Sequence, residues 1–130
     1  MNEIYEFLKK AGTYYLATVE GDQPHVRPFG TIEVFDGRLC IQTGLTKDVA
    51  RQMLLNPKVE LCAFVEGKWI RVTAKAVHEA NVDAEAHMLD AYPDLKAMYK
   101  PGDGNTAIFF LTEGQAVIAS FTEAPVTYTF

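Results

Sequence analysis

Turn-forming residue pairs divide much of this chain into short runs of β-type sequence. Gly21-Asp22 separates the first two runs and Glu113-Gly114 the last two, and pairs of this kind favour the tight turns of β-hairpins. We therefore predict an antiparallel sheet in which strands that follow one another are mostly neighbours. The seven predicted strands cover residues 13–20, 25–35, 38–43, 59–66, 69–78, 106–113 and 115–122.

Three segments have helical periodicity instead of strand alternation. Gly12 is placed to end the first, Thr46 to cap the second, and Pro93 to break the third. Many short strands with few helices favour a small closed or nearly closed antiparallel β-barrel with the helices packed outside. The helical segments are residues 4–11, 46–56 and 81–99.

Length and composition suit one domain that spans residues 1–130. The chain has 130 residues, 48% of them hydrophobic, which is enough to bury a core without a metal or disulfides. Cys40 and Cys62 lie inside apolar strand patterns, so we interpret both as buried free thiols in a reducing compartment. Residues 123–130 are either a frayed tail or a strand-like arm that packs on a neighbour.

The charge and the N-terminal sequence limit the expected partners. A net charge of -5 without a run of basic residues would repel a nucleic-acid backbone, so we expect no nucleic-acid partner. The N-terminal residues lack the pattern of a secretory leader, and no segment approaches the roughly 18 consecutive apolar residues of a membrane span. We therefore predict a cytoplasmic protein without membrane contact.

Arg27 is the first candidate for binding an anion. It lies beside Pro28, which cannot donate a hydrogen bond to a sheet, and near Gly30, which lets another group approach the backbone. An arginine beside such a break is typical of a strand crossed by a planar ligand; a surface arginine on an edge strand is the alternative. Strand alternation places His25, Arg27, Phe29, Thr31 and Glu33 on one face, and Val26, Ile32 and Val34 on the core face.

Lys47 is the second candidate, at the predicted start of the second helix. Thr43 ends a strand, Gly44 permits a turn, and Thr46 precedes the lysine. The first amides of a helix and its dipole attract anions at such a position. The alternative is a capped helix with an exposed lysine. Taken together, Arg27, Thr43 and Lys47 favour a site for one small anion.

Catalytic side chains are scarce in this sequence. The 3 histidines are far apart, without the spacing of a metal site, and the only serine has no GxSxG context. Phe29, Trp69, Tyr92 and Tyr99 are either core residues or neighbours of a ligand. We therefore predict no metal and no catalytic side chain, but a cofactor that supplies its own reactivity.

These motifs resemble those of the FMN-binding split β-barrel proteins related to pyridoxamine 5′-phosphate oxidase. The resemblance covers nearly the whole chain and rests on H-x-R-P, T-x-x-x-K and N-P-x-V-x-L, in this order and with similar spacing. It implies a mainly β fold, an antiparallel split β-barrel of about six to seven strands with flanking helices. It also implies FMN as the cofactor.

The resemblance implies roles for particular residues. Arg27 and the backbone after it would line the flavin, the start of the second helix would hold its phosphate, and Trp69 would lie near the ring or ribityl chain. Family members are usually homodimers with the flavin at the subunit interface, so the segment with Tyr92 and Tyr99, or the tail, would complete the partner's site. The implied cofactor-binding residues are Arg27, Pro28, Phe29, Gly30, Thr43, Gly44, Thr46, Lys47 and Trp69.

Three departures distinguish this chain from the true pyridoxamine phosphate oxidases. Those enzymes carry an Arg-Lys pair at the helix start, a lysine downstream of the strand arginine, and a C-terminal extension that grips substrate. Here Asp48 follows Lys47, Ile32 stands five residues after Arg27, and the sequence ends at Phe130. The resemblance therefore favours a flavin-dependent reductase, like the shorter relatives associated with nitroimidazole reduction. Its electron donor would be a small molecule such as NAD(P)H.

The alternatives are a deazaflavin or tetrapyrrole cofactor, or a protein that binds or senses flavin or haem without turnover.

Overall fold

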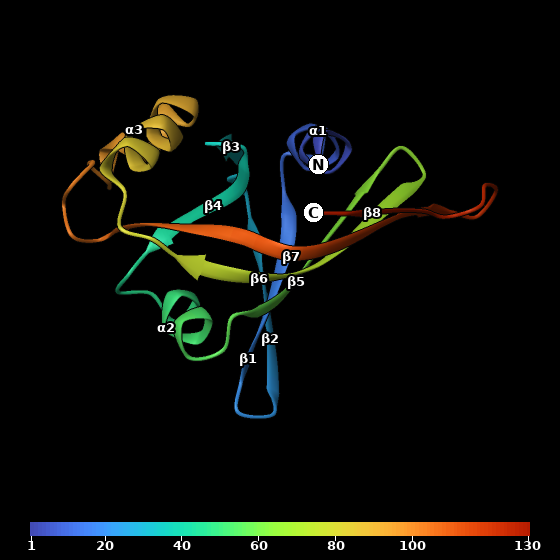
Figure 1. Cartoon of the computed structure of the whole chain (residues 1–130), viewed down its shortest axis with the longest axis horizontal. Coiled ribbons are helices and arrows are strands. Elements are labelled where there is room, and N and C mark those ends of the chain that lie inside the picture. Colours follow the sequence, from blue (N-terminus) through green and yellow to red (C-terminus); the bar gives the residue numbers. More distant parts are fainter.

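One antiparallel β-sheet curls around the core, and its two end strands do not pair with each other (Figure 1). The structure is a computed structural model that describes residues 1–130. The strands are β1 (Tyr14–Glu20), β2 (Gln23–Phe29), β3 (Glu33–Phe35), β4 (Arg38–Gly44), β5 (Lys58–Val65), β6 (Lys68–His78), β7 (Thr106–Ser120) and β8 (Val126–Thr129). They run in the order β2-β1-β5-β6-β7-β4-β3, and β8 pairs with β7.

Three α-helices and a 3₁₀ helix lie around this sheet in Figure 1. They are α1 (Asn2–Ala11), α2 (Asp48–Leu55), α3 (Val82–Ala91) and the 3₁₀ helix η1 (Pro93–Ala97). The predicted antiparallel split barrel with flanking helices is confirmed, although the sheet has 8 strands instead of six or seven. None of the helices combines the length and the apolar character needed to cross a membrane.

The predicted cap at Thr46 is wrong. Helix α2 begins at Asp48 with Lys47 as its N-cap residue, and no side chain caps it. A turn comes first, because the Lys47 amide donates to the Gly44 carbonyl at 3.0 Å. The Thr46 amide donates to Oδ1 of Asn105 at 3.3 Å, so Thr46 belongs to this turn and not to the helix.

The strand predicted over residues 25–35 is interrupted. It ends as β2 at Phe29 and resumes as β3 at Glu33, so the residues between have no strand partners. The Tyr92 hydroxyl bridges this break, since it accepts from the Ile32 amide at 3.1 Å and donates to the Ile32 carbonyl at 3.0 Å. A side chain therefore replaces a neighbouring strand at this point.

The interruption changes which side chains of β2 are buried. Val26, which we predicted in the core, is 68% exposed, whereas Ile32 is buried as predicted. β2 is an end strand that pairs only with β1, and Arg27 stands opposite the buried Leu16 on the inner face. Because strand side chains alternate, Val26 points to the outer face, where nothing covers it.

The hairpin predicted at Glu113-Gly114 is also wrong. β7 continues through this pair without a turn, from Thr106 to Ser120. We read the residue pair Glu113-Gly114 as a turn signal, but here Glu113, with a left-handed φ of 51°, forms a β-bulge against β6, with a register shift between Thr73 and Lys75. β7 pairs with β4 before the bulge and with β8 after it, in addition to β6. One strand therefore has three neighbours.

The C-terminal residues form a strand of the same sheet. Gly114 and Phe130 exchange two backbone hydrogen bonds, of 2.9 and 3.0 Å. The Phe130 ring lies directly over Gly114, where a Cβ atom would be only 2.0 Å from the ring. The tail is thus strand-like, as one of our two alternatives proposed, but its neighbour is β7 of its own chain.

Two groups of side chains fill the interior. The larger group contains 21 buried residues contributed by α1, α2 and the strands, and the smaller one lies under α3. Cys40 belongs to the smaller group, and burial raises the pKa of its thiol to about 12. The prediction that Cys62 is buried is wrong, because it points to the exposed outer face of β5.

A charged cluster ties α1, β3 and α3 together around the buried carboxylate of Glu33. Tyr5 donates to this carboxylate at 3.0 Å and Lys9 at 2.5 Å, and Nε2 of His87 lies 3.1 Å away. Burial alone would raise the pKa of Glu33, but the bonds from Lys9 and Tyr5 lower it below its ordinary value. Lys9 also donates to the Tyr92 hydroxyl at 3.0 Å, so the cluster supports the strand break at Ile32.

We expect Glu33→Gln to destabilise the protein at neutral pH by about 1–3 kcal/mol, because Lys9 loses its charged partner. A carboxyl with a lowered folded-state pKa stabilises the fold above its unfolded-state pKa, and this contribution is lost as the pH falls through the folded-state value. The difference between wild type and variant should therefore shrink below about pH 4.5. Urea unfolding at several pH values measures it.

Glu66→Gln is the matched control for this prediction. Glu66 pairs at 3.0 Å with Lys10, which lies on α1 next to Lys9, but both side chains are exposed. The loss of stability should therefore be small at every pH. Equal losses of unfolding free energy in the two variants would contradict the stabilising role of the Glu33 carboxylate. A Glu33→Gln effect that does not change with pH would contradict it as well.

Candidate functional site

Arg27 is held from the inner side of β2 by three neutral oxygen atoms. Its Nη1 donates to the Leu16 carbonyl at 3.2 Å and to the Thr18 hydroxyl at 2.7 Å. Its Nη2 donates to Oε1 of Gln52 on α2 at 2.7 Å. Arg27 forms no ion pair with a carboxylate of this chain. Burial lowers the pKa of its guanidinium, which nevertheless stays charged at neutral pH.

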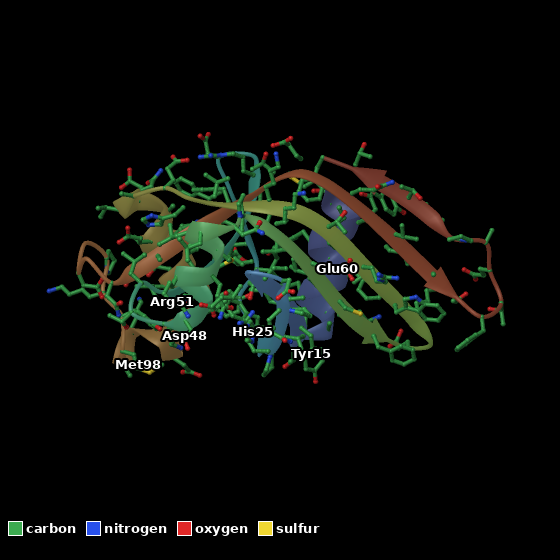
Figure 2. All side chains as sticks on the ribbon, turned by 90° about the horizontal axis from the view of Figure 1, so that it is seen from below. Tyr15, His25, Asp48, Arg51, Glu60 and Met98 are labelled. Carbon is green, nitrogen blue, oxygen red and sulfur yellow. The ribbon has the colours of Figure 1, made fainter.

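The acidic side chains near Arg27 are engaged with another arginine. Arg51 of α2 binds both carboxylate oxygens of Glu20, at 2.5 and 3.2 Å, and approaches Asp48 at 3.4 Å. Figure 2 shows Asp48 and Arg51 on α2 beside His25 of β2. The charge of Asp48 partly offsets the lowering of the Arg27 pKa by burial, but no carboxylate is in direct contact with Arg27.

The start of α2 presents the second cation. Lys47 is exposed and forms no salt bridge or side-chain hydrogen bond. It lines a hollow of about 470 Å³ beside α2. The other lining residues are Leu45, Thr46, Asp48, Arg51, Leu54 and Leu55.

Thr43 and Gly44 bring β4 to this helix. Thr43 is buried opposite Ala107 of β7. Gly44 is packed against Tyr99, whose hydroxyl oxygen would lie 3.1 Å from a Cβ atom at this position. The packing of Tyr99 therefore favours glycine here, and Tyr99 belongs to the buried interior.

Helix α2 is what connects the two cations. Arg27 bonds to Gln52 in the second turn, and Lys47 is the N-cap residue of the same helix, but no direct contact joins Arg27 with Lys47 or Thr43. The residues after Arg27 differ in exposure: Pro28 and Gly30 are exposed, whereas Phe29 is half-buried with its ring 6.1 Å from that of Tyr14. Their contact with a cofactor stays a prediction.

Trp69 lies on the other face of the sheet from Arg27. Arg27, Leu16, Leu61 and Val72 stand opposite one another across four strands and point inward. Trp69 is an odd number of residues from Val72, so it points outward. Its indole packs on Phe121 at 5.1 Å. Within one chain, Trp69 and Arg27 therefore do not meet.

Trp69 belongs to an outer face on which aromatic side chains are exposed. Tyr15 is 52% exposed and Phe64 is 66% exposed. Tyr15 stands opposite Cys62, and Phe64 opposite Trp69, so these four residues are neighbours on β1, β5 and β6. Figure 2 shows Tyr15 at the margin of the molecule, pointing away from it. We call these four residues the outer aromatic face.

Gln52 and Thr18 are site residues that we did not predict. Gln52 is 3% exposed and Thr18 is 1% exposed, and the two side chains bond to each other at 2.5 Å. One signal was available for Gln52, since it stands three residues after Val49 and so falls on the apolar face of the helix. A polar residue at such a position needs a buried partner.

Comparisons with known proteins identify the family. A family model described as pyridoxamine 5′-phosphate oxidase matches residues 1–112. A NimC/NimA family protein from Clostridium acetobutylicum is 40% identical, with a TM-score of 0.96 over 100% of this chain and 92% of that protein. No curated protein sequence matches the chain.

More distant structures share the fold. General Stress Protein 26 from Bacillus anthracis is 18% identical with a TM-score of 0.73, covering 97% of each chain. A heme binding protein from Mycobacterium smegmatis is 15% identical with a TM-score of 0.69, covering 96% of this chain and 57% of that one. Because the family match and the 40% identical structure both extend over most of the sequence, this chain belongs to the pyridoxamine 5′-phosphate oxidase family.

Proposed function

We propose that this protein binds FMN and acts as a flavin-dependent oxidoreductase. The observation that carries the proposal is Arg27, a half-buried cation bonded only to neutral oxygens. A charge that is partly removed from water without a counter-ion favours an anion that supplies one. The phosphate of FMN meets this requirement.

The start of α2 supports the same proposal independently. Lys47 has no partner and no side chain caps the helix, so its charge and the positive end of the dipole can attract a phosphate. The exposed Thr46 beside it offers a hydroxyl donor. In our proposal Lys47 and Arg27 together neutralise the phosphate.

The redox chemistry comes from the cofactor. When bound, FMN supplies hydride or electron transfer through its isoalloxazine ring. In our proposal the chain binds the phosphate and orients the ring along the backbone from Pro28 to Gly30, and no side chain serves as an obligate acid or base. The 40% identity to a NimC/NimA family protein supports a reductase over a vitamin B6 oxidase, with NAD(P)H as a suitable electron donor. The cytoplasmic location stays a prediction.

A second candidate is a protein that binds or senses flavin or haem without turnover. A heme binding protein shares this fold, although at 15% identity. The anionic propionates of haem would satisfy Arg27 and Lys47 in the same way as a phosphate. The two candidates therefore predict the same cations and differ in the chromophore.

The absorption spectrum of the purified protein should distinguish these candidates. We expect the two absorption bands of a flavin, and release of FMN on heating. Oxidation of NAD(P)H with a nitro compound or quinone as acceptor would then establish turnover. A Soret band would support haem instead, and a colourless protein that binds no added FMN would refute the proposal.

Lys47→Ala and Arg27→Ala should each weaken FMN binding by about 1–3 kcal/mol, because each removes a charge-assisted contact with the phosphate. Riboflavin, which lacks the phosphate, should bind both variants as it binds wild type. Fluorescence titration measures both affinities. Lys10→Ala, at an exposed position of α1 paired with Glu66, is the control and should leave FMN affinity unchanged. Unchanged FMN affinity in Lys47→Ala would mean that Lys47 is only the N-cap residue of α2 and does not bind the phosphate.

We propose that the protein is a homodimer with the flavin at the interface. The outer aromatic face supports this, because it combines two exposed aromatic side chains, the half-buried Trp69 and an exposed thiol on adjacent strands. Burying such a surface against a second copy gains hydrophobic free energy. In such a dimer Trp69, which lies away from Arg27 of its own chain, would be able to contact the cofactor bound by the partner.

Phe64→Glu should convert the dimer to a monomer, because it places a carboxylate on the buried face of both copies. We expect the molar mass from light scattering to halve and FMN affinity to fall with it. Val82→Glu is the control, since Val82 is 56% exposed at the start of α3, outside this face. A wild-type protein that binds FMN as a monomer would contradict the proposed interface.

A further inference from the structure

The guanidinium of Arg27 has two hydrogen-bonding edges, and the chain occupies only one of them. Nη1 donates to the Thr18 hydroxyl and Nη2 to Oε1 of Gln52, both at 2.7 Å, which uses the terminal edge. The second Nη1 bond goes to the Leu16 carbonyl. The Nε–H group, which forms the other edge together with Nη2, donates to no group of this chain.

The Nε atom on the open edge of Arg27 reaches solvent. No buried side-chain nitrogen or oxygen in the structure lacks a hydrogen-bond partner, so the unpaired Nε is not a buried atom. Two parallel N–H groups on one edge of a guanidinium match two oxygens of a phosphate or carboxylate. The edge therefore has the geometry of a bidentate oxyanion contact.

The Thr18–Gln52 pair holds the occupied edge rigidly. The Thr18 hydroxyl donates to Oε1 of Gln52 at 2.5 Å, so one amide oxygen accepts from both Thr18 and Arg27. Nε2 of Gln52 lies 3.5 Å from Oε1 of Glu20, which fixes which way the amide is turned. Both side chains are almost fully buried between α2 and β1.

We propose that Gln52 and Thr18 are positioning residues that aim the open edge of Arg27 at the bound oxyanion. This inference rests on the proposed function, in which the oxyanion is the phosphate of FMN. A neutral amide suits this role because it accepts a hydrogen bond without cancelling the charge of Arg27. A carboxylate in its place would form an ion pair and compete with the phosphate.

The test compares FMN with riboflavin, which differs from it only by the phosphate. Gln52→Leu should weaken FMN binding about tenfold, since a hydrogen bond to a charged group is lost, and leave riboflavin binding unchanged. Gln52→Glu should weaken FMN binding more than Gln52→Leu does. In an Arg27→Ala background, Gln52→Leu should have no further effect, because the two residues act as a unit.

Two further variants keep the inference testable. Gln23→Leu is the control, because Gln23 is exposed and its side chain bonds only to the adjacent Pro24 carbonyl. Thr18→Val replaces the hydroxyl by a methyl of similar size, and it decides the question if Gln52→Leu fails to fold. Equal losses for FMN and riboflavin, or a full additional loss in the Arg27→Ala background, would show a merely structural role and overturn the inference.

Failure of the proposed function has a different signature. A wild-type protein that binds neither flavin refutes FMN binding, and inorganic phosphate, measured by calorimetry, is then the probe. Weaker phosphate binding in both Arg27→Ala and Gln52→Leu would support the positioning role. Absence of phosphate binding to wild type would overturn it.

Discussion

The β-bulge at Glu113-Gly114 lets the central strand β7 pair with three other strands of the sheet. One edge of β7 pairs with β6, and its other edge pairs with β4 before the bulge and with β8 after it. The extra residue and the left-handed conformation of Glu113 bend the strand where its neighbour changes. The end strands β2 and β3 do not pair with each other, so the sheet stays open, and β2, the strand that carries Arg27, lies at one of its ends.

The two arginines near α2 have different kinds of partner. Arg51 pairs with the carboxylates of Glu20 and Asp48. Arg27 is bonded only to neutral oxygens. Because Arg51 holds the nearby acids in ion pairs, an acidic chain with a net charge of -5 keeps a local site that favours an anion. The proposed phosphate site depends on this separation more than on the number of cations.

Much of the fold could be predicted because its signals are local. Alternating apolar residues and helical periodicity located most of the strands and all three helical segments. Turn chemistry was less decisive, since a positive φ suits a hairpin and a bulge equally, and only the pairing partners of β7 distinguish them. The break after Phe29 was missed for a related reason, because it depends on Tyr92, which is distant in sequence. The prediction that Cys62 is buried was wrong because an apolar strand pattern does not show which face of the sheet stays uncovered, and Cys62 lies on the exposed face of β5.

The sequence by itself determined the fold class, the two candidate cations and the family resemblance, because each depends on residue types at short spacings. The tertiary structure decided how Arg27 and α2 are related, through the buried contact with Gln52. It also decided that Trp69 and Arg27 lie on opposite faces of the sheet, which follows from strand register. These outcomes needed the folded chain because hydrogen-bond partners and sheet faces are set by residues that are far apart in sequence and meet only when the sheet is assembled.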